Sequence, residues 1–238
     1  MIYARWRRLL PSWIDVQPVE WPGRGARMDE PPVTDPRVLA SQLARELGAQ
    51  LDAPYALFGH SLGAVIAFEL AHSLIDRGAP APAMLFASGA EAPAVRDGSK
   101  WREPLSDEAL LRELRNLRGT PEEVLSNPEL MRSALPVLRA DFLMCGAYLY
   151  RPRPPLPCPV HVFGGVDDET SREALQAWGR ETSASFTLHM LPGHHFFIHT
   201  QQAELIDLIG TALARQSGRS IGLHRSEDHE RVLRPATP

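Results

Sequence analysis

Residues 55–71 read YALFGHSLGAVIAFELA, and this stretch decides the fold. The apolar run 55–58 predicts a buried strand, whereas the residues from Ala64 onward have the apolar spacing of a helix. Residues 59–63 between them have the Gly-x-Ser-x-Gly pattern of a nucleophile elbow, in which the serine sits on a strained turn from strand to helix. We expect the glycines at both ends of the motif to let strand and helix approach without Cβ clashes. The stretch therefore predicts a nucleophilic serine, Ser61, in an α/β fold.

The start of the predicted helix bears on the chemistry of Ser61. The first N–H groups of a helix have no partner within it, and the helix dipole adds partial positive charge there. A serine that attacks a carbonyl creates an oxyanion, which backbone N–H groups beside it stabilise. We expect the backbone N–H of Leu62 to be one such donor.

The rest of the chain alternates strand patterns with helix patterns. Asp35-Pro36 combines an N-cap with a proline at the first helical position, and it predicts a helix with Leu39, Leu43 and Leu47 on one face. Such alternation predicts a mostly parallel sheet with helices on both faces. Besides the elbow strand, strands are predicted at residues 14–20, 83–87, 159–163 and 186–190, and further helices at 62–76, 172–180 and 203–213.

Residues 105–150 break this alternation, because their pattern is helical throughout. Ser106 and Asn127 are predicted N-caps, Thr120 begins a capping box, and Pro136 is expected to kink or split the last helix. An insertion between sheet strands at their carboxyl ends lies where ligands bind in such folds. We therefore expect a lid over about residues 100–150; a helical subdomain packed on the sheet edge is the other interpretation.

Composition and charge narrow the function classes. A chain of 238 residues with 44% hydrophobic content can bury one sizeable core, so we expect one domain at 1–216 and a charged, disordered tail at 217–238. The net charge of −4, without a basic stripe, argues against a nucleic-acid partner. No apolar run has the length of a membrane span. Cys145 and Cys158 lack metal-type spacing, so the sequence predicts reduced thiols in a monomeric cytoplasmic protein without metal or cofactor.

A serine nucleophile needs a base, and the base needs a carboxylate that orients it. In folds with this elbow, the order along the chain is serine, acid, histidine. Asp168 follows a predicted buried strand and is the preferred acid, with Asp167 as the alternative.

The base is expected in the loop at residues 192–197 (PGHHFF), which directly follows a predicted strand. The residues alone leave both His194 and His195 open as the base. His60, next to the serine, is expected to shape the elbow rather than to act as the base.

Together these motifs resemble the type II thioesterases of polyketide and nonribosomal peptide synthesis, within the α/β-hydrolase superfamily. Residues 21–25 (WPGRG) resemble that family's Pro-Gly-Arg-Gly loop, 55–64 its nucleophile segment and 135–142 its lid helix. Gly164-Gly165 with Asp168 is similar to its acid motif, and residues 192–197 are similar to its histidine motif, usually Gly-Gly-His-Phe-Phe. Matched in this way, the catalytic histidine is His195, and His194 stands where the family has glycine.

The resemblance implies hydrolysis of an acyl group from the phosphopantetheine arm of an acyl or peptidyl carrier protein, which clears stalled or mis-primed groups from a synthase. It implies Ser61 as nucleophile, His195 as base, Asp168 as its orienting acid and the N–H of Leu62 as an oxyanion donor. A general carboxylesterase or acyltransferase would use the same triad, and a silent protein that only binds a carrier protein is a further alternative.

The sequence departs from that family at its beginning. In the family, an N-terminal strand ends in a Gly-rich loop that supplies a second oxyanion donor. This chain starts with residues 1–6 (MIYARW), which look like the helix just after that loop. The strand and the loop are therefore missing from the sequence, and we expect the true start to lie upstream.

Overall fold

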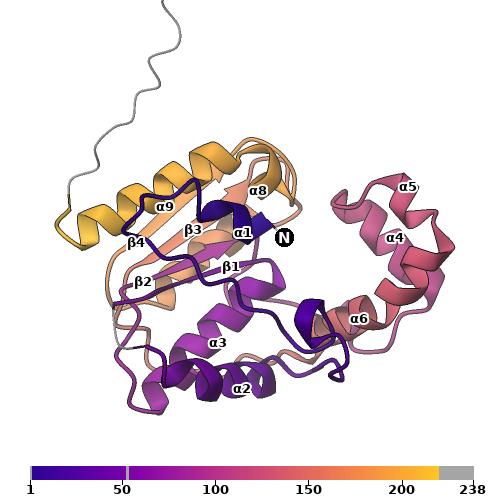
Figure 1. Cartoon of the computed structure of the whole chain (residues 1–238), viewed down its shortest axis with the longest axis horizontal. Coiled ribbons are helices and arrows are strands. Elements are labelled where there is room, and N and C mark those ends of the chain that lie inside the picture. Colours follow the sequence, from indigo (N-terminus) through magenta and orange to yellow (C-terminus); the bar gives the residue numbers. More distant parts are fainter. Residues whose placement is uncertain (1, 52–53, 220–238) are drawn as a thin grey trace, which may run out of the picture.

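Four parallel strands form the sheet in the computed structural model, which describes residues 2–51 and 54–219 (Figure 1). They are β1 (Ala56–His60), β2 (Met84–Ser88), β3 (Val160–Gly165) and β4 (Phe186–Leu191), and they lie side by side in chain order. The register places His60 opposite Ser88 and Gly165 opposite Leu191. The α/β class and these four strands are confirmed, each within two residues of its predicted ends.

Helices cover both faces of the sheet. On one face lie α2 (Pro36–Gly48), α3 (Leu62–Asp76) and α7 (Arg172–Gln176), the last continued by the 3₁₀ helix η3 (Ala177–Arg180). On the other face lie α1 (Ile2–Trp6), α8 (Phe197–Thr200) and α9 (Gln202–Gln216). Both faces of the two central strands, β2 and β3, are thus removed from water, which explains why their sequences are mostly apolar.

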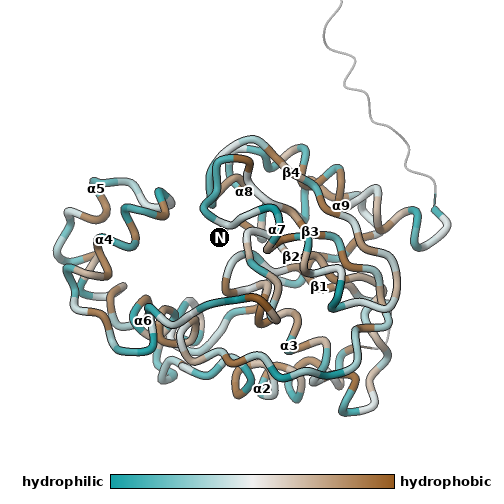
Figure 2. The backbone as a smooth tube through the Cα atoms, turned by 180° about the vertical axis from the view of Figure 1, so that it is seen from behind, coloured by the Kyte–Doolittle hydropathy of each residue, from teal (hydrophilic) through white to brown (hydrophobic). Residues whose placement is uncertain are grey.

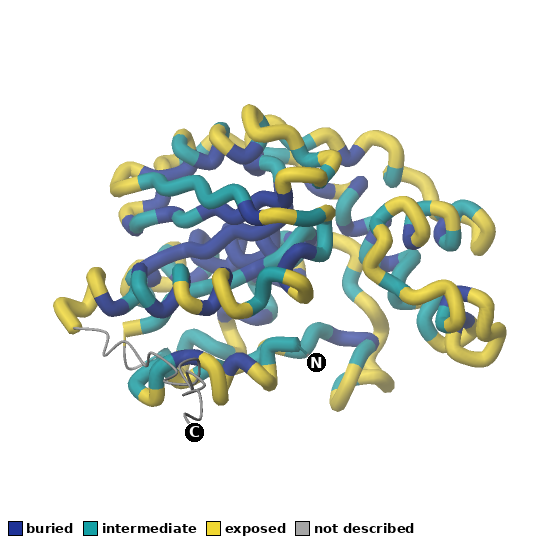
Figure 3. Tube along the Cα trace, turned by 90° about the horizontal axis from the view of Figure 1, so that it is seen from above, coloured by how far each residue is buried: buried dark blue, intermediate teal, exposed yellow. Residues whose placement is uncertain are grey.

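Alternating side chains of one strand supply the two halves of the core. In β2, Met84 and Phe86 pack with α1 and α9, whereas Leu85 and Ala87 pack with α3. Seen from above, β2 and β3 form the buried centre, β1 and β4 are mostly half-buried, and the outer helix faces are exposed (Figure 3). This two-sided core fixes the carboxyl ends of the strands as a rigid platform.

The predicted start of α2 is confirmed. Oδ1 of Asp35 accepts hydrogen bonds from the backbone N–H groups of Arg37 at 2.8 Å and Val38 at 3.2 Å, and Pro36 occupies the first helical position. A cap of this kind satisfies N–H groups that have no partner inside the helix.

The block between β2 and β3 forms a helical unit with an apolar cluster of its own. It consists of η2 (Ser99–Trp101), α4 (Asp107–Leu117), α5 (Glu122–Leu125) and α6 (Pro128–Ala147), and it stands to one side of the sheet (Figures 1 and 2). Leu110, Leu114 and Phe142 are buried within it.

One expectation for this block is wrong: Thr120 does not cap α5, because the helix begins one residue later, after Pro121, and has no side-chain cap. Of the predicted kink or split at Pro136, the split does not occur, because α6 continues through this residue as one helix of 20 residues. The predicted caps Ser106 and Asn127 are confirmed.

Two polar clusters join the helical block to the body. Arg24, in the loop around η1 (Gly25–Arg27), donates to both carboxylate oxygens of Asp141 on α6, at 2.7 and 3.3 Å. Glu69 of α3, only 2% exposed, accepts from the hydroxyl of Tyr148 at 2.8 Å and from Arg153 at 2.7 Å. Tyr148 directly follows α6, so this buried carboxylate anchors the end of the block to the elbow helix.

The predicted strand at residues 14–20 is wrong. These residues have no strand assignment, and residues 15–22 make no backbone–backbone hydrogen bond with the rest of the described chain. Ile14 and Val16 nevertheless pack against the core cluster beside α1 and α9. Their alternation reflects this one-sided burial, but a strand also needs a paired neighbour, and Pro18 supplies no N–H.

The predicted tail at 217–238 lies mostly outside the described residues, which end at Arg219, three residues beyond α9. Within residues 2–51 and 54–219, no helix has the length and apolar character needed to cross a membrane.

Candidate active site

The predicted site residues meet at the carboxyl edge of the sheet. Ser61 directly follows β1, Asp168 lies three residues after β3, and His195 lies four residues after β4. Because the strands are parallel, their carboxyl ends share one edge, and residues far apart in the sequence become neighbours there.

The structure brings Ser61, His195 and Asp168 into one hydrogen-bonded chain. Nε2 of His195 lies 2.9 Å from Oγ of Ser61, and its Nδ1 lies 3.0 Å from Oδ2 of Asp168. A carboxylate can only accept, so Nδ1–H donates to Asp168, and Nε2 is left to accept from the serine hydroxyl. The side chains of Asp168 and His195 are 4% and 12% exposed, which shields their interaction from water.

Ser61 has the strained backbone of an elbow. Its φ of 55° lies in the left-handed region, which costs a residue other than glycine about 1–3 kcal/mol. Its backbone N–H donates to the carbonyl of Ser88 at 2.7 Å, which ties the turn to β2. The surrounding structure therefore fixes the strained turn.

Only one of the two motif glycines is needed for close approach. A Cβ on Gly59 would lie 2.0 Å from the carbonyl oxygen of Gly63, a distance that the backbone cannot accept. A Cβ on Gly63 would meet nothing within 4 Å. The prediction that both glycines prevent clashes is thus right for Gly59 and wrong for Gly63, whose Cβ position points into open space.

The backbone N–H of Leu62 is positioned as the sequence predicts. Leu62 is the first residue of α3, and its N–H has no hydrogen-bond partner among the described residues. The positive end of the helix dipole coincides with this group, so it is available to an oxyanion that forms on a substrate of Ser61.

The alternative acid and the alternative base do not join the chain. Nδ1 of His194 lies 3.0 Å from the backbone carbonyl oxygen of Asp167, so it donates its proton there. Nε2 of His194 lies 3.2 Å from a guanidinium nitrogen of Arg118, which can only donate. Both ring nitrogens of His194 thus lie beside groups other than Ser61 and Asp168.

The tip of the helical block reaches the histidine loop. Arg118 ends α4 with a left-handed φ of 53°, and Gly119 follows it. Gly119 lies so close to Phe196 that an added Cβ would be 2.0 Å from the phenyl ring. Phe196 in turn packs edge-on against His195, with ring centroids 5.2 Å apart. Figure 2 shows this tip approaching the loop before α8.

Comparison with known proteins identifies the family. The family model for the thioesterase domain matches residues 1–213. The chain belongs to the thioesterase family.

Named relatives of this thioesterase are similar along most of their length. The linear gramicidin dehydrogenase LgrE of Brevibacillus parabrevis is 42% identical over 216 residues, which cover 89% of this chain and 82% of the relative. Thioesterase PikA5 of Streptomyces venezuelae is 34% identical over 238 residues, covering 99% and 81%. The structure of the RedJ thioesterase from the prodiginine pathway of Streptomyces coelicolor matches with a TM-score of 0.83 and 38% identity, covering 88% and 84%.

The name of LgrE contains the word dehydrogenase, which is said of that relative alone. The family model that matches this chain is the thioesterase domain. Within residues 2–51 and 54–219, no three His, Cys, Asp or Glu side chains gather as a metal site. The family and the elbow motif agree on hydrolysis of thioesters.

Sequence reasoning missed three residues that border the triad of this thioesterase: Ser88, Arg118 and Gly119. A signal existed for Ser88, the polar residue that ends an otherwise apolar strand and pairs in register with His60. No spacing rule predicts the contact at the tip of the helical block, because it joins residues 76 positions apart and depends on how the block folds back.

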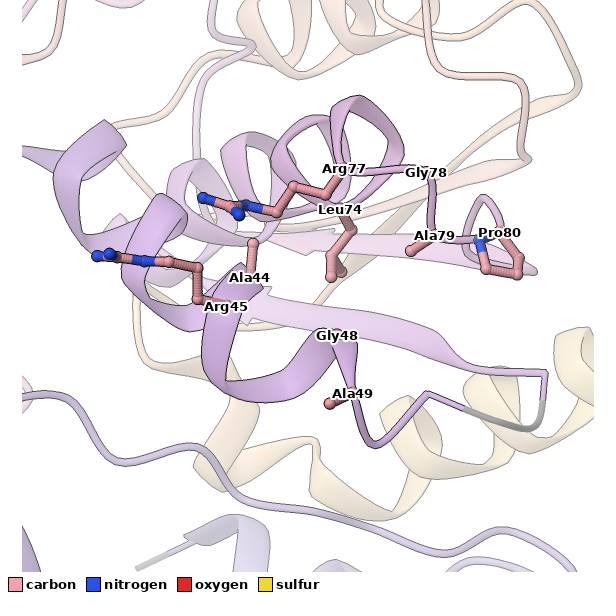
Figure 4. Close-up of a pocket in the computed structure, with 9 residues that line it drawn as sticks. All are labelled: Ala44, Arg45, Gly48, Ala49, Leu74, Arg77, Gly78, Ala79 and Pro80. Carbon is pink, nitrogen blue, oxygen red and sulfur yellow. The ribbon is translucent and has the colours of Figure 1, made fainter.

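A surface hollow of about 450 Å³ lies elsewhere on the thioesterase, between the ends of α2 and α3 (Figure 4). Leu74 lines it, and Arg45 and Arg77 lie at its sides. Ser61 directly precedes α3, and the hollow lies at the other end of this helix, about 20 Å away at 1.5 Å per residue. The hollow is therefore separate from the triad.

Proposed function

We propose that this thioesterase hydrolyses acyl groups from the phosphopantetheine arm of acyl or peptidyl carrier proteins, with Ser61 as nucleophile, His195 as base and Asp168 as its orienting acid. The observation that carries the proposal is the unbroken hydrogen-bonded chain from Asp168 through His195 to Ser61 at the start of α3. In that arrangement the serine has a base in contact, and the base has its partner.

Acylation begins when Oγ of Ser61 attacks the thioester carbonyl carbon while Nε2 of His195 takes the hydroxyl proton. The tetrahedral oxyanion accepts the backbone N–H of Leu62. The carbon–sulfur bond then breaks, and the proton on Nε2 passes to the leaving sulfur, which departs as a thiol. Asp168 holds the imidazole in one tautomer and stabilises its charged form.

Deacylation repeats these steps with water. His195 removes a proton from a water molecule that attacks the acyl-serine carbonyl, and the oxyanion again forms beside Leu62. Collapse of this intermediate releases the free acid and returns the proton to Oγ of Ser61, which restores the starting site.

The helical block at about residues 100–150 is proposed to act as the lid of a domain that spans residues 1–216. Its tip contacts the loop that carries His195, through Arg118 with His194 and through Gly119 with Phe196. A cover at this point would limit the access of bulk water to the acyl-serine.

The editing role rests on the relatives. Their names connect them with linear gramicidin and with the prodiginine biosynthetic pathway. We propose that this chain likewise clears stalled or mis-primed acyl groups, as a cytoplasmic monomer.

The test is release of a radiolabelled acyl group from an acyl-phosphopantetheinyl carrier protein, beside the Ser61→Ala variant and an oxygen ester of the same acid. Loss of Ser61 should lower the rate by several orders of magnitude. Serine-dependent release with preference for the thioester supports the proposal. Preference for the oxygen ester would indicate a general esterase, and no release above the variant from folded protein would indicate a silent binder.

A further inference from the structure

His60 lies against the candidate base rather than against the nucleophile that it precedes in the sequence. Its ring centroid is 5.1 Å from that of His195, and the rings of Phe196 and Phe197 lie at 5.7 and 5.8 Å. Gly89 lies on another side: a Cβ there would be 2.7 Å from Cε1 of the His60 ring. The ring of His60 is thus enclosed by neighbours and forms part of the wall beside His195.

One hydrogen bond fixes the orientation of this ring. Nδ1 of His60 lies 2.9 Å from Oγ of Ser88, a side chain with no exposed surface. The backbone carbonyl of Ser88 also accepts from the N–H of Ser61 at 2.7 Å. A single residue of β2 therefore holds both the turn that carries the nucleophile and the ring beside the base.

The surroundings also keep His60 uncharged. Burial lowers the pKa of His60 well below its ordinary value, and the nearby His195 and His199 lower it further when they carry charge. Its Nε2 is buried and has no hydrogen-bond partner among the described residues. A neutral ring can lie beside His195 without opposing the positive charge that His195 gains when it takes a proton.

A side chain that only filled the space beside His195 would need a fitting volume, but it would need neither a hydrogen bond nor a defined charge state. We propose that His60 is a positioning residue, which Ser88 fixes in place and which keeps Nε2 of His195 within hydrogen-bonding distance of Ser61. This inference rests on the proposed function, because it assumes that Ser61 and His195 react.

The first readout is the rate at which a fluorophosphonate labels Ser61, since this rate reports the reactivity of the serine and does not depend on the preferred acyl chain. The variants are His60→Phe, which keeps an aromatic ring without the hydrogen bond, Ser88→Ala, which removes the partner, and His60→Asn, whose amide reaches the Nδ1 position. The matched control is His161→Asn, because His161 is a half-buried histidine of the same sheet that lies 3.4 Å from a ring nitrogen of His189, away from the triad.

We expect His60→Phe and Ser88→Ala each to slow labelling and thioester kcat roughly 10- to 100-fold, with KM changed less than about twofold, because a misplaced base lowers the rate of the chemical step. His60→Asn should recover to within about threefold of the original rate, and His161→Asn should match it. The double variant His60→Phe with Ser88→Ala should lose little more than either single one, because both remove the same interaction.

The pH profile supplies a second readout. A neutral His60 predicts a one-proton acid limb of labelling in both the original protein and His60→Asn. A two-proton limb that falls to one in His60→Asn would overturn the inference. Unchanged labelling rates in folded His60→Phe and Ser88→Ala would also overturn the inference. The same holds if His60→Asn loses as much activity as His60→Phe, or if the control His161→Asn does. Failure of the original protein to label at Ser61 would instead reject the proposed function.

Discussion

At the residue scale, the elbow depends on the absence of a side chain at Gly59. The positive φ of Ser61 and the 2.0 Å approach at Gly59 belong to one turn, in which the strand and the helix nearly touch. The turn directs the hydroxyl of Ser61 toward His195, so the backbone conformation of the turn also places the reactive group.

Gly59→Ala should therefore lower the free energy of unfolding by about 3 kcal/mol, because the new Cβ overlaps the carbonyl of Gly63 and forces the turn apart. Gly63→Ala is the matched control. It should leave stability unchanged or raise it by up to about 1 kcal/mol, since alanine favours a helix and meets open space there. Urea denaturation of both variants measures the difference, and equal effects would contradict the assignment.

The two adjacent aspartates should behave differently. Asp168→Asn should lower kcat roughly 10³- to 10⁴-fold, because the amide no longer holds His195 in the tautomer that accepts from Ser61. Asp167→Asn should remain within about threefold of the original rate, since only the backbone carbonyl of Asp167 meets a histidine. Steady-state hydrolysis by both variants decides between them, and the opposite order would exchange the roles of the two residues.

Sequence reasoning was most reliable for residues whose role follows from local pattern. Ser61 and the capping residue Asp35 are recognisable because their backbone conformation imposes a short motif. The choice of His195 over His194 could not come from pattern, since both follow the same strand. It depends on which ring the folded loop turns toward Ser61, and here the family resemblance supplied what spacing could not.

At the element scale, the buried parallel strands were predictable and the unpaired segment was not. β2 and β3 lie between two helix layers, so their apolar runs identify them. Residues 14–20 alternate apolar and polar side chains as a strand with one buried face does, but no neighbouring strand pairs with them. The pattern of apolar residues indicates which side chains are buried. A strand also requires a neighbouring strand, which this pattern does not identify.

The tip of the helical block should influence catalysis through Phe196. Gly119→Ala should lower kcat roughly tenfold, because the added methyl displaces the phenyl ring that packs against His195. Asn116→Ala, in the last turn of α4 and exposed, is the control and should leave kcat unchanged. Comparison of kcat for the two variants tests the contact; equal rates would show that the tip does not bear on the base.

At the scale of the whole molecule, buried neutral histidines make stability depend on pH. Burial and, to a smaller extent, the charge of Arg153 together lower the pKa of His72 to about 4. Its ordinary value is 6.5, so between pH 6.5 and pH 4 the unfolded chain binds a proton that the folded chain does not. Stability is therefore complete above pH 6.5 and is lost as the pH falls.

His72→Leu should remove part of this loss. Between pH 7.5 and pH 5 the free energy of unfolding of the variant should fall by about 1–2 kcal/mol less than that of the original protein. Asn116→Leu, at an exposed position without a titratable side chain, should leave the pH dependence as it was. Urea denaturation at the two pH values measures both, and parallel curves for His72→Leu and the original protein would contradict the expectation.

The contact between Gly119 and Phe196 gives the reaction cycle an order of events. Phe196 lies between the tip of the helical block and the imidazole, so the tip cannot rise without uncovering one face of that phenyl ring. If the block is the lid that we propose, opening it to let the product leave also removes the cover from the ring that packs against His195. The next turnover then begins only after the tip has returned to Phe196.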